Sequence, residues 1–106
     1  MTTEQRLQEL KNLIKMTYDD INNMVSDFQD TETHAYLLSA QDLVAELVVV
    51  DKAKLKISYL IGIAAIELRD LIECTYNSIN DMVADFQDTE AHAYLLSALD
   101  LVDEII

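Results

Sequence analysis

Apolar residues recur every three or four positions along the first 28 residues of the chain. They form one stripe, which consists of Leu7, Leu10, Ile14, Tyr18, Ile21, Val25 and Phe28. This spacing is that of one face of an α-helix. Thr2 and Gln5 fit a capping box, in which each side chain bonds a free backbone N–H of the other residue. We therefore expect a helix that begins at Thr2 or Thr3.

The stripe loses its phase after Phe28, because continuing it would bury Thr31, Glu32 and Asp42. Asp30 and Thr31 are good N-cap residues, and Glu32 suits the positive end of a helix dipole. We predict a break near 27–30 and a second helix from about 31, with an inward face made of Leu37, Ala40 (with Gln41), Val44 and Leu47. The break contains neither Gly nor Pro, so a continuous helix in a domain-swapped dimer is an alternative.

The same pattern recurs 58 residues later. Residues 9–48 align with residues 67–106, and 27 of the 40 pairs are identical. The second unit therefore predicts a helix that ends near Ala84 and another that begins at about Thr89. The intervening residues have no counterpart in the repeat. We expect them to extend the third helix backwards or to form an extra helical turn.

These elements predict one all-α domain over residues 1–106. It is an antiparallel up-down four-helix bundle built from two tandemly duplicated helical hairpins, 4–48 and 62–106, joined by a linker, 49–61. The absence of Pro and the single Gly favour long helices with short connections. Up-down topology places both DFQDTE loops at one end of the bundle and the linker with both termini at the other.

The formal net charge is −13, from 20 acidic and 7 basic residues. The linker alone is positive, because it carries Lys52, Lys54 and Lys56 against Asp51. An acidic surface repels nucleic acid and anionic membranes and attracts basic proteins and cations. We expect a basic protein partner and no direct binding of nucleic acid. We also expect no membrane span, since the most apolar run, Ile57 to Ile66, is half the length of roughly 20 residues that a span needs.

The single cysteine, Cys74, excludes an intramolecular disulfide. Together with a polar N-terminus that lacks the features of a signal peptide, it favours a cytoplasmic location. Cys74 aligns with Met16 in the repeat, and we expect it to be a small residue of the core.

An acidic motif with one histidine occurs in both predicted loops. Its residues are Asp27, Asp30, Glu32 and His34 in the first unit, and Asp85, Asp88, Glu90 and His92 in the second. Carboxylates and imidazole suit a divalent cation such as zinc or manganese. The alternative is structural: Asp30 caps a helix, Glu32 interacts with its dipole and His34 is partly buried. The Glu-x-x-His spacing of di-metal bundles is missing, and we expect no cofactor.

The segment 48–66 contains more apolar residues than one helix face can hold. It predicts a surface for self-association, for which the candidates are Val49, Leu55, Tyr59, Leu60, Ile63 and Ile66. The alternative is that this segment folds over the open end of the bundle and covers it.

No sequence motif for nucleophilic catalysis or phosphate binding is present, so we expect the protein not to be an enzyme. The leading hypothesis is a small, acidic, helical interaction protein that binds a basic protein and forms a homodimer. In one form of this hypothesis it inhibits its partner by imitating nucleic acid. A second hypothesis is a metal-binding bundle. A third is an engineered repeat protein without a cellular function, which the near-identity of the units favours and unidealised residues such as Cys74 oppose.

Overall fold

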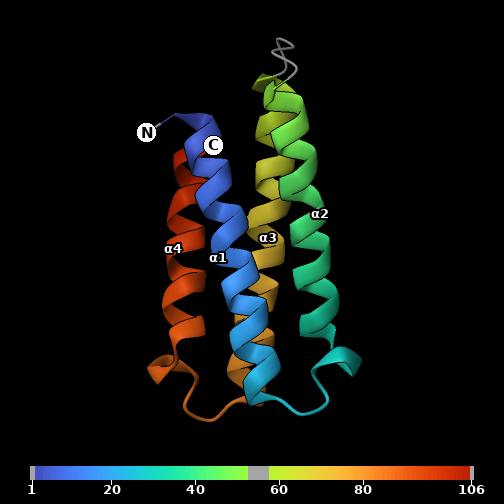
Figure 1. Ribbon diagram of the computed structural model, residues 1–106, viewed down its shortest axis with the longest axis vertical. Coiled ribbons are helices and arrows are strands. Elements are labelled where there is room, and N and C mark those ends of the chain that lie inside the picture. The colour runs from blue at the N-terminus through green and yellow to red at the C-terminus, as the bar shows by residue number, and fades with distance from the viewer. Residues whose placement is uncertain (1, 53–57, 106) are drawn as a thin grey trace.

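The computed structural model describes the backbone of residues 2–52 and 58–105, and the side chains of residues 2–51 and 62–105. In these ranges the chain forms four α-helices, coloured from blue to red in Figure 1. They are α1 (Thr3–Met24), α2 (Glu32–Lys52), α3 (Ser58–Met82) and α4 (Glu90–Ile105). Two short 3₁₀ turns, η1 (Phe28–Asp30) and η2 (Phe86–Asp88), lie between the helices of each hairpin.

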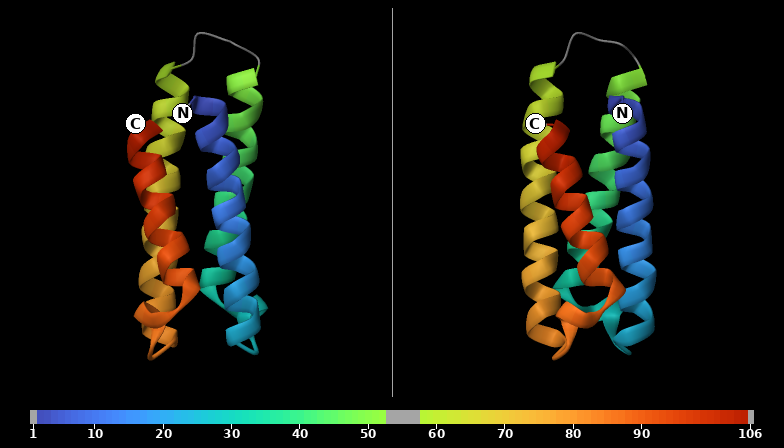
Figure 2. Two further views of the ribbon diagram at one scale, coloured as in Figure 1. Left: turned by 60° about the vertical axis from the view of Figure 1, so that its left-hand side comes forward. Right: turned by 90° about the vertical axis from the view of Figure 1, so that its left-hand side faces the viewer.

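The helices form an antiparallel up-down bundle, as the sequence predicts. α1 packs against α2 and α4, and α3 packs against the same two helices. The bundle is elongated, with dimensions of 44 × 24 × 18 Å. Both loops lie at one end and both termini lie at the other, as Figures 1 and 2 show. We refer to α1 with α2 as hairpin 1 and to α3 with α4 as hairpin 2.

The predicted apolar stripes form the core. Leu7, Leu10, Ile14, Ile21 and Phe28 are each at most 1% exposed. The predicted inward face of α2 is buried as well, and hairpin 2 buries the corresponding residues. Each large aliphatic or aromatic side chain removed from water in this way contributes about 1.5–3 kcal/mol. Packing between helices is therefore the main source of stability.

The start of α1 follows the predicted capping box. The backbone N–H of Gln5 donates to Thr2 Oγ1 at 3.1 Å, and the backbone N–H of Thr2 donates to Gln5 Oε1 at 2.9 Å. These two bonds satisfy donors that have no partner within the helix.

The break between α1 and α2 lies close to its predicted place, and the chain turns back there rather than continuing as one helix. α1 ends at Met24, and Val25 has an extended backbone. Phe28, which the apolar period assigned to the first helix, lies instead in η1 and reaches the core from there. Thr31 caps α2, because its Oγ1 accepts the backbone N–H of His34 at 3.3 Å.

The linker extends two helices rather than only the third. α2 continues to Lys52 and α3 begins at Ser58, so the described part of 49–61 lengthens both. As a result, α2 and α3 project beyond the ends of α1 and α4 (Figure 2).

The expectation that Cys74 belongs to the core is wrong, because its side chain is exposed. The buried neighbours on α3 are Ile72 and Thr75. Position 74 falls between these inward-facing positions and points outward, as does Met16, which is 40% exposed at the matching position of α1.

The two hairpins make different polar contacts at matching places. Thr33 Oγ1 on α2 donates to Ser78 Oγ on α3 at 2.6 Å. The matching pair on the other side is Ala91 and Asp20, and there the backbone N–H of Ala91 donates to Asp20 Oδ2 at 2.8 Å. Asp20 thus satisfies a donor in the first turn of α4 from a different helix, and its negative charge lies at the positive end of the α4 dipole.

We predict that Asp20→Ala lowers the free energy of unfolding by about 1 kcal/mol, because the Ala91 amide loses a charged acceptor. Chemical denaturation would measure the change. Asp19→Ala is the matched control, since Asp19 is exposed and forms no hydrogen bond with a described residue; we expect a change below about 0.5 kcal/mol there. Equal losses in the two variants would contradict the assigned contact.

Candidate functional site: the acidic loop pole

Six carboxylates lie on the two loops at one end of the bundle. We call them the loop pole: Asp27, Asp30, Glu32, Asp85, Asp88 and Glu90. All six side chains are exposed. Asp27 and Asp85 precede the 3₁₀ turns and form no capping hydrogen bond with their side chains. Their oxygens therefore face solvent rather than a structural partner.

Each loop is anchored by an aromatic cluster. Phe28 packs edge-on against Tyr18, with ring centroids 5.1 Å apart, and against His34 at 5.2 Å. The Tyr18 hydroxyl and His34 Nε2 are joined by a hydrogen bond of 3.0 Å. Hairpin 2 repeats this cluster with Tyr76, Phe86 and His92, where the hydroxyl–imidazole distance is 2.9 Å. Edge-on ring contacts stabilise such clusters beyond the area they bury, so each loop has a fixed backbone.

The predicted metal ligands do not converge. His34 and His92 form hydrogen bonds with tyrosines, and none with the exposed carboxylates of the loop pole. Over the part of the chain that the structure describes, no three His, Cys, Asp or Glu residues are grouped so that they could hold a metal ion. A metal site at the loop pole therefore stays a prediction without support from the geometry.

Two further tyrosines interact with the loop-pole glutamates. The Tyr36 hydroxyl donates to Glu32 Oε2 at 3.3 Å, and the Tyr94 hydroxyl donates to Glu90 Oε2 at 3.0 Å. The negative charge of Glu32 raises the pKa of Tyr36. The hydrogen bond to Glu90 raises the pKa of Tyr94. Tyrosine is neutral near neutral pH in any case, and the raised pKa of both phenols extends this neutral range upward, so neither adds charge to the loop pole.

The end of the bundle that holds the termini contains two ion pairs. Arg6 Nε lies 3.2 Å from Glu104 Oε2, and Arg69 Nη1 lies 3.7 Å from Asp103 Oδ1. Exposed pairs of this kind contribute little to stability, typically about 0–1 kcal/mol. The expected positive end at Lys54 and Lys56 lies outside the described residues.

The predicted association surface is partly described. Val49 is 68% exposed, Ile63 is 49% exposed and Ile66 is 44% exposed. Leu55 lies outside the described residues, as do the side chains of Tyr59 and Leu60. Val49 lies in the last turn of α2 and Ile63 in the second turn of α3, at the end of the bundle that holds the termini (Figure 2).

A polar groove between α1 and α2 was not predicted. It is lined by residues that include Lys11, Lys15 and Gln41. The sequence contained a signal for it, because Lys11 and Lys15 lie one helical turn apart and Gln41 aligns with the apolar Leu99 of the repeat. Without the structure, nothing showed that Gln41 faces the lysines.

Among the described helices, none combines the length and the apolar character that crossing a membrane requires. Comparisons with protein-family models, with curated proteins and with solved structures each found no match to this chain.

We predict that His34→Ala lowers the free energy of unfolding by about 1–2 kcal/mol, because it removes the hydrogen bond to Tyr18 and the edge contact with Phe28. The loss should be the same in EDTA and in added zinc, measured by thermal and chemical denaturation. Tyr18→Phe is the control, since it removes the hydroxyl and keeps the imidazole. If zinc stabilises the wild type and Tyr18→Phe but not His34→Ala, the metal hypothesis is correct instead.

Proposed function

We propose that this chain is a non-enzymatic interaction protein that binds a basic protein partner through the half of the bundle that carries the loops. One observation supports this most directly. Residues 16–41, which form the loop half of hairpin 1, contain five acidic residues, and residues 74–99 of hairpin 2 contain four; neither segment contains a lysine or an arginine. Every helix contributes to this surface, and no basic side chain interrupts it near the loop pole.

The carboxylates are available to a partner. Eighteen of the 20 acidic residues are exposed, and the other two, Asp20 and Asp51, are half-buried. Only Asp103 and Glu104 form ion pairs within the described residues. Like charges on one surface repel each other, and a basic partner would relieve this repulsion. Such complementarity chiefly accelerates association and selects against acidic partners.

The scaffold is also suited to binding. Phe28 and Phe86, each 1% exposed, fix the two loops to the core. A surface that is already ordered loses little conformational entropy when a partner docks. Carboxylates on rigid helices can also occupy a groove that otherwise accepts phosphates, and inhibition of a nucleic-acid-binding protein is the specific form of this proposal that we favour. This last step rests on analogy between charge patterns.

The test is binding to a fluorescent lysine-rich peptide, measured by anisotropy over a range of salt concentrations. The variant Asp27→Asn/Asp30→Asn/Asp85→Asn/Asp88→Asn removes four charges from the loop pole. Exposed ion pairs contribute about 0.2–1 kcal/mol each, so we expect binding weaker by about tenfold. Binding of the wild type should weaken as salt increases.

The matched control removes four charges from elsewhere: Glu4→Gln/Glu9→Gln/Glu46→Gln/Glu67→Gln. All four side chains are exposed and form no ion pair with a described residue. We expect a smaller loss than in the loop-pole variant. Equal losses would mean that net charge alone attracts the peptide, and salt-independent binding would contradict the electrostatic mechanism. A DNA duplex that competes for a basic DNA-binding protein would test the inhibitory form.

We also propose self-association through the projecting ends of α2 and α3. The supporting observation is the exposure of Val49 and Ile63 near these ends and of Ile66 about one turn further along α3. Leu43, Leu47 and Val50 on α2 line a shallow groove together with Ile63 and Ala64 on α3. Apolar surface of this kind is stabilised when a second copy covers it.

Light scattering coupled to size exclusion tests this second proposal. We expect a dimer that persists at high salt, because burial of apolar surface is not screened by ions. Val49→Asp/Ile63→Asp should convert it to a monomer. Leu96→Asp is the control, since Leu96 is similarly exposed, at 43%, on α4. A wild type that is monomeric at all concentrations would exclude the proposal.

A further inference from the structure

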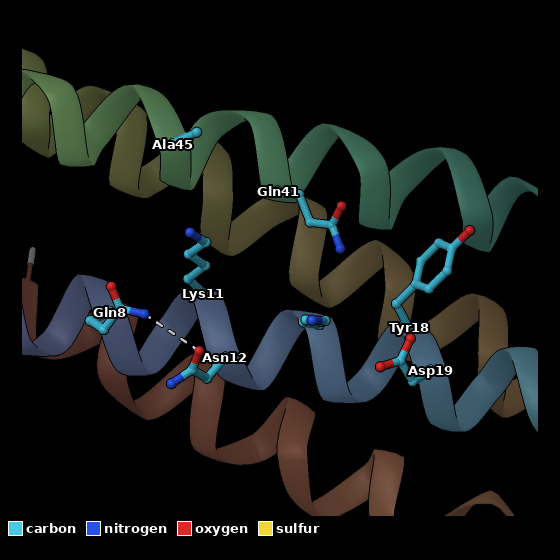
Figure 3. Close-up of a pocket in the computed structure, with 8 residues that line it drawn as sticks. Gln8, Lys11, Asn12, Tyr18, Asp19, Gln41 and Ala45 are labelled. Atoms are coloured by element: carbon cyan, nitrogen blue, oxygen red, sulfur yellow. Dashed lines mark hydrogen bonds between the residues drawn. The ribbon is translucent and has the colours of Figure 1, made fainter.

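The groove between α1 and α2 differs in character from the rest of the surface. It encloses a volume of about 540 Å³. Seven of its eight lining residues carry a polar group; the lining consists of Gln8, Lys11, Asn12, Lys15, Tyr18, Asp19, Gln41 and Ala45. Figure 3 shows Lys11 and Gln41 directed into the space between the two helices.

Two cations and one carboxylate, Asp19, line this groove. Lys11 and Lys15 lie four residues apart, so they occupy adjacent turns on one side of α1. Neither forms an ion pair with a described carboxylate, whereas Arg6 and Arg69 both do. Two like charges on adjacent turns repel each other, and a bound anion would remove this repulsion. Lys11 and Lys15 thus form a local concentration of positive charge on a chain whose net charge is −13.

The groove also holds unused hydrogen-bonding groups. Gln41 is half-buried, yet its carboxamide forms no hydrogen bond with another described residue. Within the lining, the one hydrogen bond among described side chains is a long one, from Gln8 Nε2 to Asn12 Oδ1 at 3.5 Å. The amide nitrogens of Asn12 and Gln41 are therefore available as donors.

The two hairpins have diverged at this place. Seven of the eight lining residues differ from their counterparts 58 positions later, and the exception is Tyr18, which matches Tyr76. Six of the 13 differences between residues 9–48 and 67–106 are in the groove. The loop pole, in contrast, is identical in the two units.

The residues that replace the groove lining in hairpin 2 change its charge. In hairpin 2, Arg69 replaces Lys11 and pairs with Asp103, which replaces Ala45. Glu73 replaces Lys15, and Leu99 replaces Gln41. Hairpin 2 thus pairs its remaining cation internally, and its matching groove, of about 250 Å³, is lined by Glu73, Tyr76 and Asn77 together with Leu96 and Leu99. Hairpin 1 keeps two cations and an amide that face each other across the helices.

We propose that the groove between α1 and α2 binds a small molecule that carries a carboxylate or phosphate group. Lys11 and Lys15 hold the oxyanion, and the amides of Asn12 and Gln41 donate hydrogen bonds to it. Asp19 repels an anion from the other end of the groove and accepts a hydrogen bond from a hydroxyl or ammonium group of the same ligand. This site goes beyond the proposed function, because its ligand has the opposite charge to a basic protein partner.

The test is an NMR titration of the protein with inorganic phosphate and, separately, with succinate, at constant ionic strength. The side-chain amide signals of Asn12 and Gln41 report on the site directly. We expect these signals to shift and saturate. Saturation with only one of the two probes supports the proposal and identifies the oxyanion. Absence of saturable shifts with both probes overturns it.

Two variants and one control complete the test. Lys11→Gln/Lys15→Gln should weaken binding by about tenfold or more, and Gln41→Leu, which introduces the residue of hairpin 2, should weaken it while preserving both charges. Lys52→Gln/Lys54→Gln changes the net charge by the same amount as the first variant and should leave the affinity unchanged. An equal loss in this control would mean that the anion responds to overall charge, which overturns the assignment of the site.

Discussion

Burial of an aliphatic stripe against two neighbouring helices is the interaction on which the rest of the structure depends. α1 and α3 each pack against both α2 and α4. Because the two hairpins close on each other in this way, both loops must lie at the same end of the bundle. The six carboxylates of the loop pole are exposed and lie outside the apolar core that fixes this arrangement. Their common position is a consequence of apolar packing, which brings together charges that the sequence separates by 58 residues.

The sequence predicted those features that depend on neighbouring residues. The capping box of Thr2 and Gln5, the break before Thr31 and the inward faces of α1 and α2 all follow from local spacing. Features that need a contact between distant segments could not be predicted. The hydrogen bond between Asp20 and Ala91, the engagement of His34 by Tyr18 and the position of Gln41 opposite Lys11 depend on how the helices face each other.

Repulsion between like charges destabilises the loop end of the bundle more than the end that holds the termini. Near the loops, carboxylates share one end of the bundle without a basic residue, and their mutual repulsion weakens the folded state. The aliphatic core and the aromatic clusters around Phe28 and Phe86 offset it. Towards the termini, Arg6 and Arg69 are paired, and Lys11 and Lys15 face the groove. The acidic loop end is therefore suited to a basic partner, whereas the groove nearer the termini is suited to an anion.

The two hairpins are nearly identical in sequence, but they make different polar contacts with each other, so one cannot simply replace the other. Thr33 meets Ser78 on one side, and Ala91 meets Asp20 on the other. If two copies of hairpin 2 paired, the Ala91 amide would face Ser78, whose side chain is shorter than that of aspartate and uncharged. The first turn of α4 would then lose its anionic acceptor. The contact of Asp20 with Ala91 thus favours pairing of hairpin 2 with hairpin 1 over pairing with a copy of itself.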